Sequence, residues 1–391
     1  MLIVGIDIAK RKHEATIINS SGDIIGKSFA FDNSTAGATF LLEKINTMNT
    51  NNEPIAFGME ATGHYWLALY SRLLDDGFTV HVINPIQSDA LRNLYIRKTK
   101  NDSKDSFIVA ETIRFGRFSE TVLADSDLLA LRQLCRFRMS QVDSIASLKK
   151  QAIAVIDQVF PEYEKLFSDI FGKSSIDLLS EAATPEEILA INTDTLASLL
   201  NKSSHGRFGN NKAIEVKEAA KTSFGIKLAS NAFSFQIRQI IQQIKFCESQ
   251  LDVLDDEIAE LYKSFNSTVD TITGIGPVIG AVIISEIGDI RRFSEPAKLV
   301  AFSGIDPTVK QSGEFTGSKN HMSKRGSPFL RRAIWQAAFV ASNRDPVLSA
   351  FYQKKRAEGK AHRTAIGAVC RKLLYIIYSI MRSNAIYTPI A

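Results

Sequence analysis

The chain has little cysteine: Cys135, Cys247 and Cys370 are the only three in 391 residues, and no C-x-x-C pair occurs. This excludes a disulfide framework and a thiolate zinc site. The six histidines are scattered and form no H-x-x-x-H pattern, so they add no candidate metal pair.

Long apolar runs are also missing, since no stretch approaches the ~18 residues that a membrane-spanning helix needs. The first residues, MLIVGIDIAK, are typical of a strand rather than of a secretory signal. We therefore expect a cytoplasmic protein with no membrane partner. A hydrophobic content of 45% with 23% charged residues fits a folded soluble chain, and 391 residues suit two or three domains.

Two nucleotide-binding motifs are lacking. The chain has no G-x-x-x-x-G-K-[ST] loop, which disfavours the use of ATP. The segment TGIGPVIG fails the dinucleotide fingerprint, because Ile279 occupies the third glycine position and Gly280 follows one residue late.

The positive charge is concentrated in the last third of the chain. Residues 291–372 hold 17 Lys and Arg against 5 Asp and Glu, a net charge of +12, while the rest of the chain carries −7. This asymmetry predicts a C-terminal part that binds a polyanion. On charge alone, a solvated basic surface is an equally good interpretation.

Residues 1–120 alternate short apolar runs with amphipathic stretches, a pattern typical of an α/β domain. Turn clusters such as SSGD and NP separate the segments. The predicted order is β-β-β-α-β-α-β-α. Strands are expected at 2–9, 13–19, 24–31, 54–59 and 79–83, and the first two helices at 34–48 and 64–75.

Residues 121–267 contain two long helical stripes, at 126–167 and 233–265, in which apolar residues recur at i, i+3, i+4 and i+7. An antiparallel pair or a dimeric coiled coil would bury both stripes. Between them, residues 168–232 are predicted to form an insertion of short helices. Residues 268–391 are expected to be mostly α-helical.

Four carboxylates fall where they could converge. Asp7 lies inside an apolar strand and Glu60 ends the fourth strand, while Asp102 and Asp105 share one face at the start of a helix. Clustered carboxylates repel unless divalent cations neutralise them, so the pattern predicts a Mg²⁺ site. Two ions ~4 Å apart would clamp the attacking and leaving oxygens of a phosphodiester. A lone Asp at a strand end is otherwise a common turn residue.

Basic residues surround the Asp pair, which is consistent with the approach of a phosphate backbone. These residues are Arg92, Arg97, Lys98, Lys100 and Lys104.

The TGIGPVIG segment favours a helix-hairpin-helix turn. Gly274 and Gly276 would let backbone amides approach a phosphate, and Pro277 would begin the following helix. A tight turn between packed helices is the alternative. The predicted nucleic-acid contacts continue in the basic loop that follows, at Lys319, Lys324, Arg325, Arg331 and Arg332.

Ser312 and Gly313 lie in that basic loop, where a serine hydroxyl could approach a phosphate closely. No histidine partner is evident, so a Ser-His-Asp triad is not supported. From the residues alone, a turn or hydrogen-bonding role stays open beside activation by a carboxylate-metal cluster.

The Asp-Glu-Asp-Asp set in this element order resembles the ribonuclease H-like fold, in particular its RuvC-like branch of Holliday-junction resolvases. Over residues 1–167 and 233–384 the chain resembles the DEDD-type bacterial insertion-sequence transposases, a family of bridge-RNA-guided serine recombinases. The resemblance rests on the motifs VGIDIAKRKHEA, GMEATGHYW, VINP, KTKNDSKDSFIVA, TGIGPVIGAVIISEIGDIRRF, LVAFSGIDPTVKQSG, MSKRGSPFLRRAIWQAA and FYQKKRAEGK.

The resemblance implies that Asp7, Glu60, Asp102 and Asp105 bind Mg²⁺ and that Ser312 forms a transient covalent link to DNA. Such a link keeps the energy of the broken phosphodiester, so rejoining needs no ATP. It also implies a structured guide RNA as a partner and a homodimer or homotetramer.

Two other functions stay open at this stage. A junction-cutting nuclease would use the same carboxylates with water as the nucleophile. A catalytically silent DNA- or RNA-binding protein would need none of the four acids.

Overall fold

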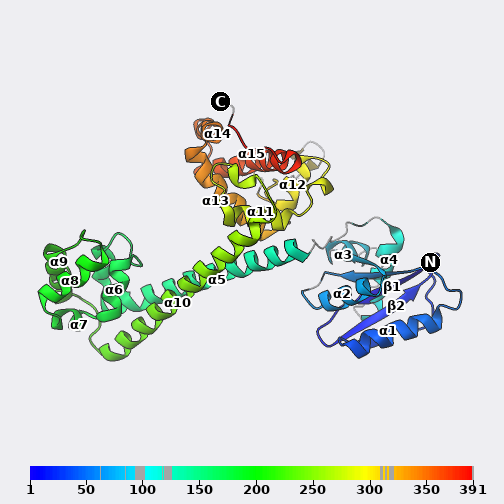
Figure 1. Cartoon of the computed structure of the whole chain (residues 1–391), viewed down its shortest axis with the longest axis horizontal. Coiled ribbons are helices and arrows are strands. Elements are labelled where there is room, and N and C mark those ends of the chain that lie inside the picture. The colour runs from blue at the N-terminus through cyan, green and yellow to red at the C-terminus, as the bar shows by residue number, and fades with distance from the viewer. Residues whose placement is uncertain are drawn as a thin grey trace. The chain divides into compact units, whose positions relative to one another are not determined.

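The computed structural model describes residues 1–61, 63–83, 85–92, 102–116, 118, 126–308, 311–312, 315–316 and 321–389. The chain divides into two compact units, residues 1–123 and 124–391 (Figure 1). The division into three domains at residues 120 and 267 stays a prediction.

The first unit is built on a five-stranded sheet with the order β3-β2-β1-β4-β5. Strand β1 pairs antiparallel with β2 and parallel with β4, and β5 extends the parallel half. The first and fourth strands are therefore neighbours, as the convergence of the acids requires. The strands are β1 (Leu2–Asp7), β2 (Lys12–Ile18), β3 (Phe29–Asp32), β4 (Ile55–Glu60) and β5 (Thr79–Ile83).

Helices cover both faces of this sheet. Helices α1 and α2 pack on the face that carries Val4, Ile6 and Phe57. Helix α4 packs on the other face, in a cluster with Ile3 and Ile18. The helices are α1 (Thr35–Met48), α2 (Leu67–Asp75), α3 (Pro85–Arg92) and α4 (Asp102–Phe115). The predicted β-β-β-α-β-α-β-α order is confirmed except that a further helix, α3, lies between β5 and the predicted last helix.

The third strand differs from the prediction. We expected residues 24–31, but β3 begins only at Phe29, and Ile24 forms an isolated bridge to Ile18. The reason is Gly26, whose φ of 75° interrupts the extended backbone.

Helix α4 lies unusually close to β1. A Cβ atom at Gly5 would be 2.1 Å from the carbonyl oxygen of Ser106 and 2.4 Å from the amide nitrogen of Ala110. The hydroxyls of Ser106 and Thr16 also form a buried 2.7 Å hydrogen bond between α4 and β2. Glycine at position 5 therefore sets the distance between the sheet and the helix.

We expect Gly5→Ala to lower the free energy of unfolding of the first unit by ~3 kcal/mol, because the clash involves backbone atoms that cannot rotate away. Calorimetry of the full chain measures this as a shifted transition. Gly367→Ala is the control, because no heavy atom lies within 4 Å of its added methyl group. Equal transitions for both variants would contradict the close packing.

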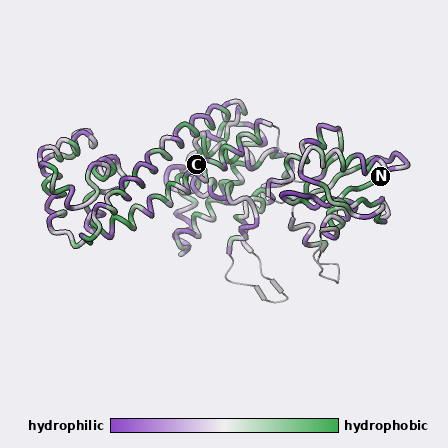
Figure 2. The backbone as a smooth tube through the Cα atoms, turned by 90° about the horizontal axis from the view of Figure 1, so that it is seen from below, coloured by the Kyte–Doolittle hydropathy of each residue, from purple (hydrophilic) through white to green (hydrophobic). Residues whose placement is uncertain are grey.

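In the second unit, α5 (Ser126–Val159) and α10 (Ser230–Lys263) form a long antiparallel pair. Lys149 pairs with Glu248 at 2.7 Å, and Arg138 pairs with Asp255. Along both helices the backbone alternates between hydrophobic and hydrophilic residues, as amphipathic helices do (Figure 2). Of the two predicted arrangements, the structure has the pair within one chain.

Helix α5 ends at Val159 rather than at the predicted residue 167, because Pro161 cannot continue it. Residues 168–232 form short helices, as predicted, and pack on Val155, Ile156 and Ile241 of the long pair, while their status as an insertion stays a prediction. After η1 (Pro161–Leu166), the helices of this segment are α6 (Lys173–Glu181), α7 (Pro185–Ala190), α8 (Thr193–Ser203) and α9 (Asn210–Lys221).

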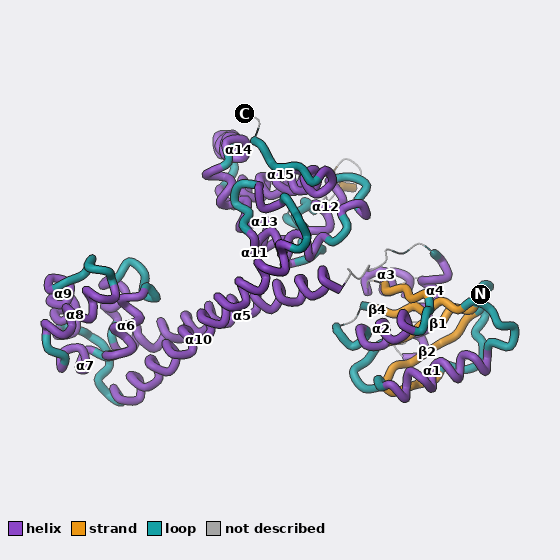
Figure 3. The backbone as a smooth tube through the Cα atoms, in the orientation of Figure 1, coloured by secondary structure: helices purple, strands orange, loops and turns teal. Residues whose placement is uncertain are grey.

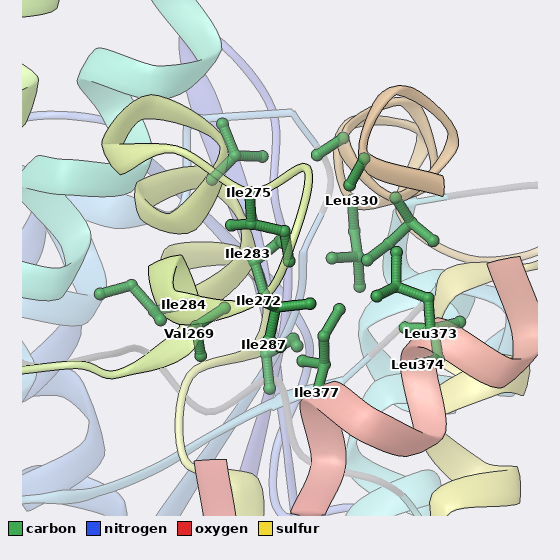
Figure 4. Packing of buried hydrophobic residues seen from close by; sticks show 14 of the residues in the cluster. Val269, Ile272, Ile275, Ile283, Ile284, Ile287, Leu330, Leu373, Leu374 and Ile377 are labelled. Carbon is green, nitrogen blue, oxygen red and sulfur yellow. The ribbon is translucent and has the colours of Figure 1, made fainter. Parts of the chain in front are cut away.

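The rest of the second unit is mostly helical, as predicted (Figure 3). Isoleucines and leucines from α11, α13 and α15 meet in one core (Figure 4). The elements are η2 (Val269–Thr271), α11 (Pro277–Ile287), η3 (Ile290–Arg292), α12 (Pro296–Ser303), β6 (Gln311–Ser312), β7 (Phe315–Thr316), α13 (Pro328–Arg344), α14 (Pro346–Ala357) and α15 (His362–Ser383).

Helix α15 is an exception to the expectation that no apolar run is long enough to span a membrane. By length and composition it could cross a membrane, and half of its most apolar window is buried. Leu373, Leu374 and Ile377 lie inside the core shown in Figure 4. The apolar side of α15 is therefore explained by packing.

Candidate functional site

Asp7 and Glu60 lie side by side at one edge of the sheet. In the parallel pair β1–β4, Ile6 stands opposite Met59, so the next position brings Asp7 beside Glu60. Side chains alternate between the faces of a strand, so both acids share the face of Gly5 and Gly58, which α4 covers. The two acids were expected to converge only if the first and fourth strands were neighbours, and the β1–β4 pairing meets this condition.

Helix α4 brings Asp105 to the same face. Asp105 is buried, with 7% of its surface exposed. The neighbouring Ser106 lies against Gly5, two residues before Asp7. Asp102 is the first residue of α4, one turn before Asp105, and its side chain lies outside the part of the chain that is described.

The sequence reasoning missed one further acid at this edge. Glu14 stands directly opposite Asp7 in the antiparallel pair β1–β2. Directly opposed residues have Cβ atoms ~5 Å apart, so Glu14 adds negative charge next to Asp7. The signal was the hairpin register between the first two strands, which places residues 7 and 14 opposite each other.

The donor chemistry of this edge suits a divalent cation that prefers oxygen ligands. Three carboxyl groups lie on neighbouring strands and one lies on the helix that covers them. In the described part of the chain, no three His, Cys, Asp or Glu side chains come close enough together to hold a metal ion. The side chain of Asp102 lies outside that described part.

Of the basic residues near the Asp pair, Lys104 lies exposed on α4. Arg97, Lys98 and Lys100 lie outside the described residues, as does the side chain of Arg92.

The two glycines of the predicted hairpin turn differ in their surroundings. Gly274 has a φ of 91°, and a Cβ atom there would lie 2.6 Å from the carbonyl oxygen of Ala337 in α13. Gly276 faces open space and caps α11, with Pro277 as the first helical residue. The close packing on α13 is thus enough to explain why residue 274 is a glycine. Gly276 leaves the backbone amides at the start of α11 accessible.

Ser312 lies on an extended hairpin arm. Pro307 bridges to Met322 at the base of the arm, and the Thr308 amide donates to the His321 carbonyl at 2.7 Å. Further along, β6 pairs with β7, and Ser312 stands opposite Phe315. The serine is therefore the last residue of β6.

The predicted nucleic-acid-binding residues differ in whether an acidic side chain pairs with them. Lys324 and Arg325 are exposed, just before α13. Arg331 donates to the carbonyls of Ser303 and Gly326, at 3.1 and 3.4 Å. These bonds fix the guanidinium without neutralising its charge.

Arg332, in contrast, has an acidic partner, because it pairs with Asp143 of α5 at 2.8 Å. Lys319 lies outside the described residues.

The buried thiols are not candidates for nucleophiles. Burial raises the pKa of Cys135 and of Cys370 to about 12. The thiolate is the reactive form, so both cysteines are inert near neutral pH.

Comparison with known proteins identifies the family. Residues 4–161 match a family described as a transposase of the DEDD type, and residues 266–353 match the IS116/IS110/IS902 transposase family. The chain belongs to this transposase family. The matched segments contain Asp7, Glu60, Asp102 and Asp105 in the first part and Ser312 in the second.

Relatives of this transposase align over nearly its whole length. A 44.8 kDa protein of insertion element IS116 from Streptomyces clavuligerus is 22% identical, over 99% of this chain and 96% of its own. A 42 kDa protein of insertion element IS900 from Mycobacterium paratuberculosis is 21% identical, over 98% and 96%. The pilin gene-inverting protein of Moraxella lacunata is 24% identical, over 97% and 96%.

Proposed function

We propose that this transposase cuts and rejoins DNA strands to move or invert a DNA segment. The observation that carries the proposal is the strand pairing that brings Asp7 beside Glu60 at the ends of β1 and β4, the carboxylate edge, in a chain of the transposase family. Relatives named for insertion elements and for pilin gene inversion support both outcomes of strand exchange.

In this proposal Asp7, Glu60, Asp102 and Asp105 hold Mg²⁺, with Glu14 adding negative charge beside Asp7. The bound cation would stabilise charge that develops on a phosphodiester. The protein's part is to keep the acids in register, through the β1–β4 pairing and the packing of α4 on Gly5.

Ser312 is the proposed nucleophile. Its hydroxyl loses a proton to solvent, its Oγ bonds to a DNA phosphorus, and the 3′ oxygen leaves and takes up a proton. A 3′-hydroxyl of the partner strand then attacks the phosphoserine, which frees Ser312 and forms the new phosphodiester. Ser312 lies in the second family match, within the C-terminal part that carries the excess of positive charge.

We further propose that the N-terminal unit is RuvC-like, that the turn at Gly274 and Gly276 is helix-hairpin-helix-like, and that Lys324, Arg325, Arg331 and Arg332 contact nucleic acid. A structured guide RNA and a homodimer or homotetramer complete the proposed assembly. The excess of positive charge over residues 291–372 supports a nucleic-acid partner of the second unit.

The test is a search for a protein–DNA adduct, with labelled element-end DNA, Mg²⁺ and the flanking transcript. We expect an adduct that mass spectrometry maps to Ser312, and we expect Ser312→Ala to abolish it. The control is Ser383→Ala, whose exposed hydroxyl bonds only to nearby backbone at the end of α15, by donating to the Ser379 carbonyl and accepting from the Ala385 amide. Cleavage by Ser312→Ala without an adduct would establish the water-using nuclease instead.

A further inference from the structure

An open basic groove lies in the second unit, beside the start of α13. Its volume is about 1030 Å³, and residues from the base of the Ser312 arm, from α13 and from the start of α15 line it. The lining residues used below are Lys324, Arg331, Arg332, Trp335, Gln336 and Arg363. In the described part of the chain, the lining includes no acidic residue.

The groove keeps a positive charge. The partners of Arg331 are backbone carbonyls, which carry no net charge. The Arg332–Asp143 pair is partly exposed, so it binds weakly and can yield to another anion. Among the described residues, Lys324 and Arg363 form no ion pair with an acid. The groove therefore attracts an anionic ligand.

Trp335 gives this charged groove an aromatic wall. The ring is partly buried and packs against the core of the unit, so it is held in place. Cationic side chains around a fixed aromatic surface are the combination that binds unpaired nucleotides, with the base stacked on the ring and the phosphates on the cations. A duplex buries its base faces by stacking, so only an unpaired base can use the ring. The Gln336 side-chain amide can both donate to and accept from the edge of that base.

The groove also lies at the base of the Ser312 arm. Met322 and His321 line it, and both pair with residues at the start of the arm. Ser312 follows Thr308 by four residues, which limits the distance between their Cα atoms to ~14 Å. A DNA strand held in the groove thus stays within reach of the serine.

We propose that this groove binds an unpaired nucleotide of a DNA strand, with its base stacked on Trp335 and its phosphates on Arg331, Arg332 and Arg363. The inference rests on the proposed function, in which Ser312 acts on DNA. It adds that the strand next to the serine is locally unpaired when it binds.

The test uses the full chain and measures binding without Mg²⁺, so it does not depend on cleavage. Labelled single-stranded DNA, the matching duplex and single-stranded RNA of the same sequence are compared by fluorescence anisotropy. We expect single-stranded DNA to bind best and Trp335→Leu to weaken it by ~10-fold or more, because stacking contributes strongly for each base. Trp335→Phe should restore most of the affinity, because it keeps an aromatic face.

Two further variants separate the groove from general effects. Arg363→Gln, at an exposed position, should weaken binding and reduce the salt dependence by about one phosphate contact. Phe235→Leu removes an exposed aromatic ring on α10, outside the groove lining, and should change nothing.

In a Trp66→Phe background Trp335 is the sole tryptophan, and its fluorescence should be quenched when single-stranded DNA binds. Equal affinity for duplex and single strands, or a Trp335→Leu protein that binds normally, would overturn the proposal. Preference for RNA would overturn the assignment to DNA. A lack of strand exchange with intact binding would count against the proposed function alone.

Discussion

Replacing Asp7 by asparagine is expected to abolish DNA cleavage while the protein stays folded. The amide keeps the shape of the carboxyl group but removes the negative charge that a divalent cation needs. Metal assistance contributes several kcal/mol to such reactions, and each ~1.4 kcal/mol is a factor of ten in rate. Cleavage of labelled element-end DNA should therefore fall at least ~100-fold, and Glu60→Gln should behave alike.

The matched control is Asp32→Asn, in strand β3 of the same sheet. Asp32 is exposed and lies 3.9 Å from Lys12, so its charge contributes little to stability. The same chemical change there should leave cleavage unchanged. If Asp7→Asn cut DNA as well as Asp32→Asn did, the carboxylate edge would not be the catalytic centre.

Much of the first unit could be predicted, because its elements are local. Strand and helix periodicity depends on neighbouring residues, and the predicted element order is confirmed apart from the additional helix α3. The pairing of β1 with β4 then brings Asp7 and Glu60 together without further information. The predicted start of β3 was wrong because Gly26 changes the backbone direction inside an apolar run.

Contacts between distant segments could not be predicted in this way. Nothing near Arg332 indicates that Asp143, 189 residues earlier, lies beside it. The basic groove likewise combines the base of the Ser312 arm, α13 and α15, and only packing brings Trp335 and Arg363 into the same groove. The charge count indicated a basic region at residues 291–372, but it did not indicate which Lys and Arg side chains line one groove.

Glu286 also has partners far away in the sequence that could not be predicted, and their loss is expected to lower the free energy of unfolding strongly. It lies in the apolar motif VIISEI and is 4% exposed. Arg136, 150 residues earlier on α5, donates to both of its oxygens, at 2.6 and 3.1 Å. Ser327, the N-cap of α13, donates to the same carboxylate at 2.8 Å. One buried acid thus joins α5, α11 and α13.

We expect Arg136→Met to lower the free energy of unfolding of the second unit by ~3 kcal/mol. The variant removes the guanidinium that binds both Glu286 oxygens and leaves the buried carboxylate with Ser327 and with the charge of Arg132, whose own hydrogen bond goes to the Ser285 carbonyl. A poorly paired buried charge is far costlier than the pair is favourable. Denaturation of the full chain, followed by far-ultraviolet circular dichroism, measures the loss. The double variant Arg136→Met with Glu286→Gln should be more stable than Arg136→Met alone, because no charge then remains uncompensated.

Arg138→Met is the matched control on the same helix. Arg138 pairs with Asp255, and both side chains keep about a quarter of their surface exposed, 24% and 29%. Solvent can replace a lost partner there, so the expected cost is at most ~1 kcal/mol. Equal losses for the two arginine variants would mean that the buried position of Glu286 contributes nothing, and that α5, α11 and α13 are held together by apolar packing alone.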